Sequence, residues 1–238
     1  MKNSCIFLLI PLFLVALSCS NSVPEKAKEI EYALVIHGGA GYMTPERLSE
    51  EKQEEYLKIL SKVTQLGLNI LENGGSSTDA VEAVIRIMED SPLFNAGRGA
   101  VFTHHGTNEL DASIMNGVDL NAGAVAGVKT IKHPISAARK VMEKSEHVLL
   151  AGEGAEDFAA GEGVEIVDPS YFFTMERFNE LINVLEREGI NTDSLKKEKL
   201  GTVGCVALDK SGNICAGTST GGRTNKKYGR IGDSPLIG

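Results

Sequence analysis

One junction in the 238-residue sequence places a threonine where it could act as a nucleophile. Thr202 follows Gly201 directly, at the point where a charged stretch meets an apolar, strand-like run. A threonine hydroxyl attacks poorly until a neighbouring base takes its proton. Cleavage of the Gly201–Thr202 bond would free an α-amine on Thr202, with an ordinary pKa of about 7.7–8.0, and that amine could be the base. Gly201 would favour the cut because glycine tolerates backbone geometry that a Cβ forbids.

The run after Thr202 predicts a hairpin that brings a second hydroxyl close to the first. If residues 209–213 form a five-residue turn, Leu208 pairs with Ile214, and Thr202 lies opposite Thr220. On these residues alone a plainer interpretation stays open, in which both threonines are ordinary β-branched strand residues.

A charged pair follows the hairpin. Arg230 and Asp233 stand three residues apart, in a segment with glycines at positions 229 and 232. A fixed cation and anion at this spacing could bind the carboxylate and the ammonium of an amino acid. A surface ion pair in a loop is the alternative that the pattern leaves open.

These residues need a scaffold, and the apolar pattern predicts one of mixed helices and strands. A buried strand is expected at 32–36, followed by a helix with Thr44 as its N-cap and Pro45 at its first position, ending at Gly74 and Gly75. The further expected elements are a helix capped by Ser76 or Ser77, strands within 100–126, short helices at 134–142 and 153–160, a helix around 175–185, a solvated linker over 186–199, and strands on both sides of the turn at 209–213. This order predicts a layered sandwich of sheet and helices in the α/β class, rather than a regular βαβ alternation.

The composition bounds the class of protein. Lys and Arg number 24 against 32 Asp and Glu, which gives a formal charge of −8, and 42% of the residues are hydrophobic. These values are typical of a globular chain of one large or two small domains, and they exclude a disordered one. The acidic excess argues against nucleic acid as the main partner.

Residues 1–18 are predicted to be a signal peptide. A short basic start precedes an apolar run from Ile6 to Leu17 that is too short to span a bilayer comfortably. Because Ser18 precedes Cys19 as in a bacterial lipobox, we expect a lipoprotein with Cys19 lipidated and residues 19–30 as a tether. A plain signal peptide and an uncleaved anchor stay open. The expected location is the periplasm or the membrane surface of a bacterium, with membrane contact only through the lipid.

Two cysteines, Cys205 and Cys215, lie within the expected fold. Their number and spacing fit neither a disulfide scaffold nor a zinc site, so both are expected to be buried free thiols.

Five motifs, taken in order, resemble those of the plant-type asparaginases, also called isoaspartyl peptidases, which are N-terminal nucleophile hydrolases. The motifs are 37–41 (HGGAG), 94–99 (FNAGRG), 201–204 (GTVG), 218–222 (TSTGG) and 229–235 (GRIGDSP). The resemblance runs from about Tyr32 to Gly238 and implies a four-layer αββα sandwich. Gly221 favours asparaginases over the related glycosylasparaginases, which typically carry Asn at this position.

The resemblance implies a role for each matching residue. Thr202 would be the self-released nucleophile, Thr220 would hydrogen-bond its hydroxyl, and Asn95 would support it. Arg230 would bind the substrate α-carboxylate, and Asp233 its α-ammonium. Backbone carbonyls would hold a structural sodium ion, and no other cofactor is implied; these carbonyls belong to Met88, Glu89, Ser91, Phe94, Ala96 and Arg98.

The resemblance also implies a division of the chain. Residues 31–201 would form a first subunit that ends in a linker from about 168 to 201, and residues 202–238 would begin a second subunit. Two such processed units would pair as a dimer. Family members continue well beyond the motif that ends at Pro235, with a further active-site threonine, so we expect the sequence to be incomplete at its C-terminus.

The implied reaction is the hydrolysis of L-asparagine to aspartate and ammonia, of β-aspartyl dipeptides, or of both, through an aspartyl ester on Thr202. The substrate is therefore a small molecule. A glycosylasparaginase-type hydrolase and a catalytically inactive, truncated surface lipoprotein are the alternatives.

Overall fold

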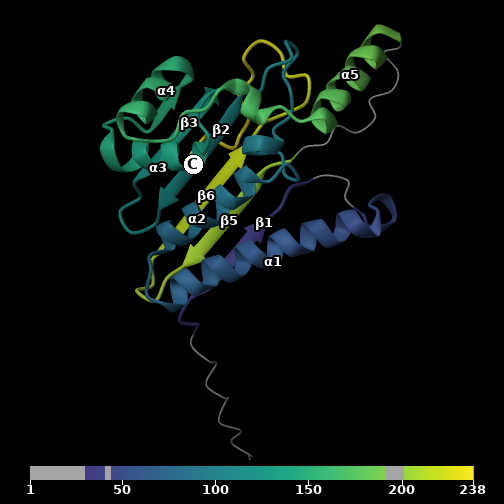
Figure 1. Cartoon of the computed structure of the whole chain (residues 1–238). Helices are drawn as coiled ribbons and strands as arrows, with labels where there is room; N and C mark the ends of the chain where they lie inside the picture. The colour runs from purple at the N-terminus through teal and green to yellow at the C-terminus, as the bar shows by residue number, and fades with distance from the viewer. Residues whose placement is uncertain (1–29, 41–43, 191–200, 238) are drawn as a thin grey trace, which may run out of the picture.

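The computed structural model describes residues 30–40, 44–190 and 201–237, and it shows a mixed α/β unit built on one six-stranded sheet (Figure 1). The strand order is β1-β5-β6-β2-β3-β4, with β3 and β4 parallel and the other neighbours antiparallel. The strands are β1 (Ala33–His37), β2 (Leu110–Asn116), β3 (Ala122–Val128), β4 (Leu149–Ala151), β5 (Val203–Leu208) and β6 (Ile214–Thr220). The first strand of the sequence therefore lies beside a strand from near its end.

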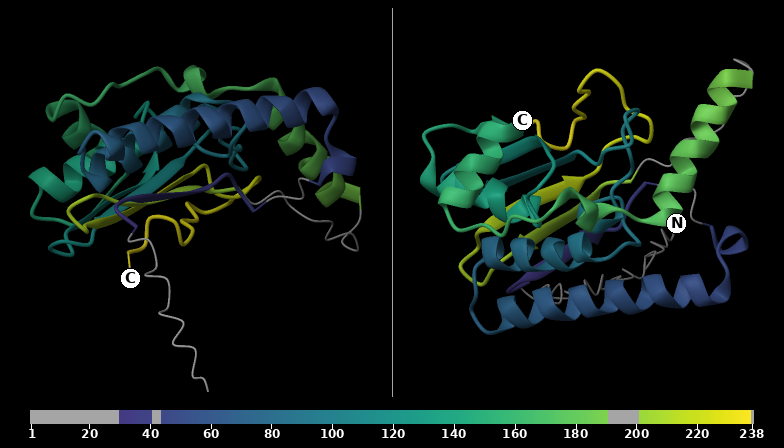
Figure 2. Two further views of the ribbon diagram at one scale, coloured as in Figure 1. Left: turned by 90° about the horizontal axis from the view of Figure 1, so that it is seen from below. Right: turned by 45° about the horizontal axis from the view of Figure 1, so that its top comes forward.

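Four of the described helices pack on one face of this sheet, as Figure 2 shows in its left-hand view. The helices are α1 (Glu50–Glu72), α2 (Ser77–Asp90), α3 (Pro134–Lys144), α4 (Gly152–Gly161) and α5 (Met175–Ile190). The first four cover the sheet, whereas α5 projects away from it at one end (Figure 1). The core lies between these helices and the sheet, and its largest side chains include Leu71, Ile85, Leu110, Ile114 and Ile135.

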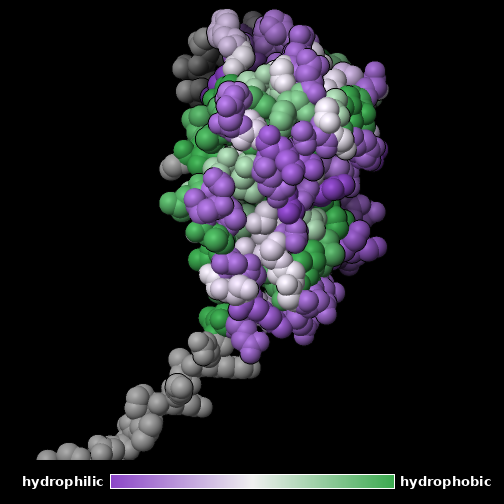
Figure 3. Space-filling model, turned by 90° about the vertical axis from the view of Figure 1, so that its left-hand side faces the viewer, coloured by the Kyte–Doolittle hydropathy of each residue, from purple (hydrophilic) through white to green (hydrophobic). Residues whose placement is uncertain are grey.

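The opposite face of the sheet carries no helix among the described residues. Because side chains alternate between the faces of a strand, one set of each strand is buried and the other set points away from the helices. Val35, Val206 and Ile214 belong to the second set and are 66%, 44% and 52% exposed. Figure 3 shows hydrophobic residues along the left-hand edge of the molecule, the side of this uncovered face. The described residues therefore provide one sheet and one helical layer, and a sandwich of four layers is not present among them.

The hairpin predicted around 209–213 is confirmed. Leu208 pairs with Ile214, and Val203 pairs with Ser219. The Asp209 carboxylate stabilises the turn by accepting hydrogen bonds from the backbone N–H groups of Ser211 and Asn213, both at 3.0 Å.

The start of the first long helix was predicted wrongly. Thr44 begins only a short 3-10 turn, Pro45–Arg47, and its side chain makes no capping hydrogen bond. Leu48 is extended, and α1 begins at Glu50, where the Ser49 side chain accepts a hydrogen bond from the Lys52 N–H. Proline sets the backbone for one turn, but the side-chain acceptor that caps the helix stands four residues later.

The segment expected to be a linker is largely helical where it is described. The range 168–201 contains a 3-10 turn, Pro169–Phe172, and the whole of α5, which continues to Ile190. The charged residues 186–188 were assigned to solvated coil, yet Glu and Arg are good helix formers and tolerate an exposed helix end. Residues 191–200, and with them the rest of the predicted linker, lie outside the described residues.

Several other predictions are confirmed. Ser76 is the N-cap of α2 and accepts a hydrogen bond from the Asp79 N–H. Cys205 and Cys215 are buried and free, and burial raises the pKa of their thiols to about 12 and about 11.

The expected signal peptide at 1–18 and most of the tether lie outside the described residues. No helix in the described ranges has the length and apolar character needed to cross a membrane.

Gly67 provides a test of the packing of α1. An ideal Cβ at this position would lie 2.6 Å from Leu34 Cδ2 and 2.9 Å from Val84 Cγ2, so α1 approaches β1 and α2 closely there. We expect Gly67→Leu to lower the free energy of unfolding by about 1–3 kcal/mol, because extra methyl groups overpack the core. Urea denaturation measures this change.

Gly154 is the matched control, because it is helical and exposed, and a Cβ there would meet no atom within 4 Å. Gly154→Leu should be neutral or slightly stabilising, since leucine favours a helix more than glycine does. Equal effects of the two substitutions would contradict the close approach of α1.

Candidate active site

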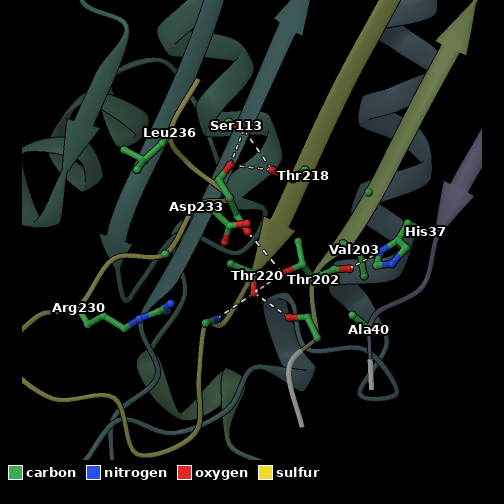
Figure 4. Close-up of a pocket in the computed structure, with 15 residues that line it drawn as sticks. His37, Ala40, Ser113, Thr202, Val203, Thr218, Thr220, Arg230, Asp233 and Leu236 are labelled. Carbon is green, nitrogen blue, oxygen red and sulfur yellow. Dashed lines mark hydrogen bonds between the residues drawn. The ribbon is translucent and has the colours of Figure 1, made fainter. Parts of the chain in front are cut away.

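A pocket of about 600 Å³ opens on the uncovered face of the sheet (Figure 4). Its walls come from four neighbouring strands, β1, β5, β6 and β2, and from the segment 230–236 that returns across them. The side chains that the strands or their ends contribute belong to His37, Thr202, Thr218, Thr220 and Ser113. Side chains alternate between the two faces of each strand, and the apolar set is buried under the helices. These polar side chains therefore point to the opposite face of the sheet, the one without helices.

The predicted pairing of two threonines is present. Thr202 Oγ1 donates a hydrogen bond to Thr220 Oγ1 at 3.3 Å, and Thr220 Oγ1 in turn donates to the Gly201 carbonyl oxygen at 2.8 Å. The Gly222 N–H also donates to Thr220 Oγ1, at 3.0 Å. The hydroxyl of Thr202 is therefore connected through Thr220 to the carbonyl of the residue directly before it.

The Gly201 carbonyl has a second donor, Asn95. Asn95 Nδ2 donates to this oxygen at 2.8 Å and to the Gly222 carbonyl at 2.7 Å, while Asn95 Oδ1 accepts from the Val101 N–H at 3.0 Å. Asn95 is buried, so these bonds fix its amide. Two donors on one carbonyl oxygen form the arrangement that stabilises negative charge when a nucleophile attacks that carbonyl.

Gly201 is required for a different reason from the one expected. Its backbone does not have a positive φ, so it does not occupy the region that favours glycine. A Cβ at this position would lie 2.8 Å from Asn95 Cβ. Glycine therefore provides the space that lets the Gly201 carbonyl reach the Asn95 amide.

The predicted charged pair lies at the rim of the same pocket. Arg230 and Asp233 are exposed, and neither side chain has a hydrogen-bond or ion-pair partner among the described residues. A Cβ at position 232 would lie 3.1 Å from Arg230 Nη1, so Gly232 leaves room for the guanidinium. Both charges are therefore available to a ligand, as the interpretation in terms of an amino-acid substrate requires.

Three further hydroxyl residues lie at this site and were not among the predicted site residues. Ser113 Oγ and Thr218 Oγ1 both donate to the Ser234 carbonyl, at 2.6 and 2.8 Å, and so attach the segment of Arg230 and Asp233 to the sheet. Ser234 Oγ lies 3.4 Å from Thr202 Oγ1. Thr218 and Thr220 share a face by their spacing of two, but the contact with residue 234 depends on how the later segment folds back.

His37 was also missed as a side chain with a role of its own. Its Nδ1 lies 2.9 Å from the Thr202 carbonyl oxygen, and Figure 4 shows the ring beside the pocket. In the sequence, His37 is marked only as the start of a glycine-rich motif. Gly39 has a φ of +127°, and a Cβ there would lie 3.7 Å from Gly201 Cα, so this motif does approach the site closely. Gly41 lies outside the described residues.

A buried carboxyl group lies beside Thr220 on the next strand. Asp111 pairs with Thr220 in the β2–β6 register and is fully buried. Its Oδ1 accepts from the Gly127 N–H at 2.8 Å, whereas Oδ2 has no hydrogen-bond partner among the described residues. Burial raises the pKa of Asp111, and the positive charge of the buried Lys226 opposes this rise.

The carbonyls predicted to hold a sodium ion lie in the last turn of α2 and in the loop that follows it. The six carbonyls differ in their partners: those of Met88 and Ala96 accept backbone hydrogen bonds from Ser91 and Gly99. The carbonyls of Glu89, Ser91, Phe94 and Arg98 have no hydrogen-bond donor among the described residues, and the first three of these residues are buried. Unpaired backbone carbonyls, most of them on buried residues, fit a small, hard cation with oxygen ligands.

The Glu89 side chain helps to fix this loop on the sheet. Its Oε1 accepts from Ser219 Oγ at 2.6 Å and from the Ile135 N–H at 3.0 Å. Its Oε2 lies 3.4 Å from His133 Nδ1. Complete burial raises the pKa of this carboxyl group.

Comparison with known proteins gives these motifs a family. An isoaspartyl peptidase of Salmonella typhimurium is 49% identical over 212 residues, covering 86% of this chain and 67% of the relative. An isoaspartyl peptidase of Escherichia coli is 49% identical over 212 residues (86% and 65%), and the isoaspartyl peptidase/L-asparaginase of Homo sapiens is 42% identical over 205 residues (86% and 65%). The chain spans about two thirds of the length of these relatives. Because the model of the asparaginase family also matches residues 30–238, the chain belongs to the asparaginase family.

Proposed function

We propose that this protein is a hydrolase that acts on L-asparagine, on β-aspartyl dipeptides, or on both, with Thr202 as its nucleophile. The observation that carries the proposal is the hydrogen-bond chain from Thr202 through Thr220 to the Gly201 carbonyl, which also accepts from Asn95. The names of the relatives, isoaspartyl peptidase and isoaspartyl peptidase/L-asparaginase, support the same substrates.

The first step is self-cleavage. Thr202 Oγ attacks the carbonyl carbon of Gly201, and the oxyanion that forms takes up the hydrogen bonds from Asn95 and Thr220. The hydroxyl proton is transferred to the nitrogen of Thr202 as the C–N bond breaks, which leaves an ester on Thr202 and a free α-amine. Water then hydrolyses the ester, releases the Gly201 carboxylate and restores the hydroxyl.

The second reaction uses the new α-amine as the base. It takes the Thr202 hydroxyl proton while the oxygen attacks the side-chain carbonyl of the substrate, and the leaving ammonia or amino acid takes a proton as its C–N bond breaks. Water hydrolyses the aspartyl ester and regenerates the enzyme. Arg230 binds the α-carboxylate and Asp233 the α-ammonium, since both charges face the pocket without a described partner.

A glycosylasparaginase is less well supported. Gly221 has no room for a side chain, because a Cβ would lie 2.6 Å from both Ala100 Cβ and Asn95 Oδ1. An asparagine at this position would displace the Asn95 amide from its present place. The backbone around Gly221 therefore favours the asparaginase and isoaspartyl peptidase reaction.

The fold, localisation and assembly are proposed in finer detail as well. A second sheet and a second helical layer would complete an αββα sandwich by covering Val35, Val206 and Ile214. A crystal structure of a longer chain that lacks these two layers would refute the sandwich.

We also propose export as a lipoprotein with Cys19 lipidated, and pairing of two processed units. The intact mass of membrane-extracted protein tests the lipid, and sedimentation tests the pairing.

We propose that the unpaired carbonyls of Glu89, Ser91, Phe94 and Arg98 hold a structural sodium ion. Its charge would stabilise the loop that presents Asn95, and it would take no part in bond cleavage. Replacing sodium by choline at constant ionic strength should lower the melting temperature, because a ligand that binds the folded state stabilises it. An unchanged melting temperature over a range of sodium concentrations would contradict the site.

Thr202→Ala tests the nucleophile. The unmodified chain should split into two fragments, the second beginning at Thr202, whereas Thr202→Ala should stay whole and hydrolyse neither substrate. Intact mass after incubation at neutral pH measures the first result. Thr64→Ala, on α1 and outside the pocket, is the matched control and should split normally. Splitting of Thr202→Ala at the same bond would exclude Thr202 as the nucleophile.

Arg230→Ala tests substrate binding. The KM for asparagine should rise about 10- to 100-fold, the size expected when a charge-assisted hydrogen bond is lost, with a smaller change in kcat. Self-cleavage should continue, because none of the hydrogen bonds of Gly201 and Thr202 among the described residues comes from Arg230. Arg86→Ala, on α2, removes an arginine from outside the pocket and should change neither constant. An unchanged KM for Arg230→Ala would remove the carboxylate role.

A further inference from the structure

His37 makes a contact that the proposed reaction does not yet use. It is the last residue of β1, and its Nδ1 lies 2.9 Å from the carbonyl oxygen of Thr202. No other donor to this carbonyl is present among the described residues. The ring reaches this position beside a small neighbour, since His37 pairs with Gly204 in the β1–β5 register.

The chemistry of this contact fixes the tautomer of the ring. A carbonyl oxygen can only accept a hydrogen bond, so Nδ1 must carry the proton, and Nε2 of the neutral ring is then unprotonated. In a peptide without such a carbonyl acceptor, no interaction favours the tautomer with the proton on Nδ1. The tautomer is therefore a direct spectroscopic signature of the contact.

The contact gains importance when the Gly201–Thr202 bond is cut. In the intact chain, Asn95 and Thr220 hold the Gly201 carbonyl, and the peptide bond transmits this restraint to Thr202. Cleavage separates Thr202 from that restraint. The bond from His37 then remains on the other side of the residue, where it fixes the plane of the peptide between Thr202 and Val203.

Resting on the proposed function, we propose that His37 is a positioning residue that orients the freed amine and hydroxyl of Thr202 for substrate hydrolysis. It acts through the Thr202 carbonyl and does not touch the reacting atoms. Its removal should therefore affect hydrolysis much more than self-cleavage, because a nucleophile misplaced by about 1 Å can lose 100-fold in rate.

Two substitutions at His37 separate this role from a loss of folding. His37→Leu removes the donor, whereas His37→Asn retains a donor, Nδ2, at nearly the position of Nδ1. His105→Leu makes the same change at an exposed histidine of a turn outside the pocket. We expect His37→Leu to split as the unmodified chain does, and its kcat to fall about 10- to 100-fold with little change in KM.

The conservative variant and the control decide the interpretation. His37→Asn should recover most of the lost kcat, and His105→Leu should match the unmodified chain. A kcat for His37→Leu equal to that of the unmodified chain would overturn the proposal, as would a His37→Asn variant no better than His37→Leu. Equal losses in self-cleavage and hydrolysis, accompanied by a lower melting temperature, would show a purely structural role and overturn it too.

Nuclear magnetic resonance of ¹⁵N-labelled protein tests the contact independently of activity. At about pH 8, the ring signals that disappear in His37→Asn should show Nδ1 protonated and Nε2 unprotonated. The Nε2–H form would overturn the proposal. If the unmodified chain neither splits nor hydrolyses asparagine while Nδ1 is protonated, the proposed function fails although the contact stands, so the two failures are distinguishable.

Discussion

The antiparallel register between β5 and β6 is the constraint on which the rest of the site depends. It places Thr202 opposite Thr220 and directs both side chains to the face of the sheet without helices. A shift by one residue would exchange the two faces of a strand, burying Thr202 and exposing Val203 and Cys205. Because the helical face needs the apolar set in its core, the packing that stabilises the fold also selects the register that forms the site.

Each face of the sheet therefore has a separate function. On the helical face, close packing dominates, and glycines such as Gly67 and Gly217 permit it: a Cβ on Gly217 would lie 2.8 Å from Val81 Cγ1. On the other face, polar groups from neighbouring strands converge, and hydrogen bonds from Ser113 and Thr218 attach the segment of Arg230 and Asp233 across them. Asn95 comes from the helical side of the fold and reaches Gly201 because neither Gly201 nor Gly221 has a side chain.

The sequence predicted the parts of the site that depend on local pattern. The hairpin register follows from turn length and strand period, and it placed Thr220 beside Thr202 correctly. Local pattern also restricted the cap of α2 to Ser76 or Ser77, of which Ser76 is the cap, but it placed the start of α1 at Thr44, since a proline pattern does not show where the first side-chain acceptor acts. It also ended α5 too early, because a run of charges is compatible with both coil and an exposed helix end.

Contacts between distant segments could not be predicted in this way. His37 and Thr202 are 165 residues apart, and Ser113 and Ser234 are 121 apart. The spacing of these residues does not indicate that β1 lies beside β5, or that the segment 230–236 folds back over β2. The space that Gly201 leaves for Asn95 is likewise a property of the assembled fold. From the sequence alone, the need for glycine at position 201 was explained by its backbone freedom instead.

In the proposed reaction, Thr202 forms a covalent ester with the aspartyl part of the substrate. Self-cleaved protein mixed with asparagine and quenched rapidly in acid, then digested and mapped by mass spectrometry, tests this most directly. We expect an aspartyl adduct on the peptide that begins with Thr202, formed and lost at the rate of turnover. Turnover of asparagine with the adduct on another residue, or with none on Thr202, would contradict it.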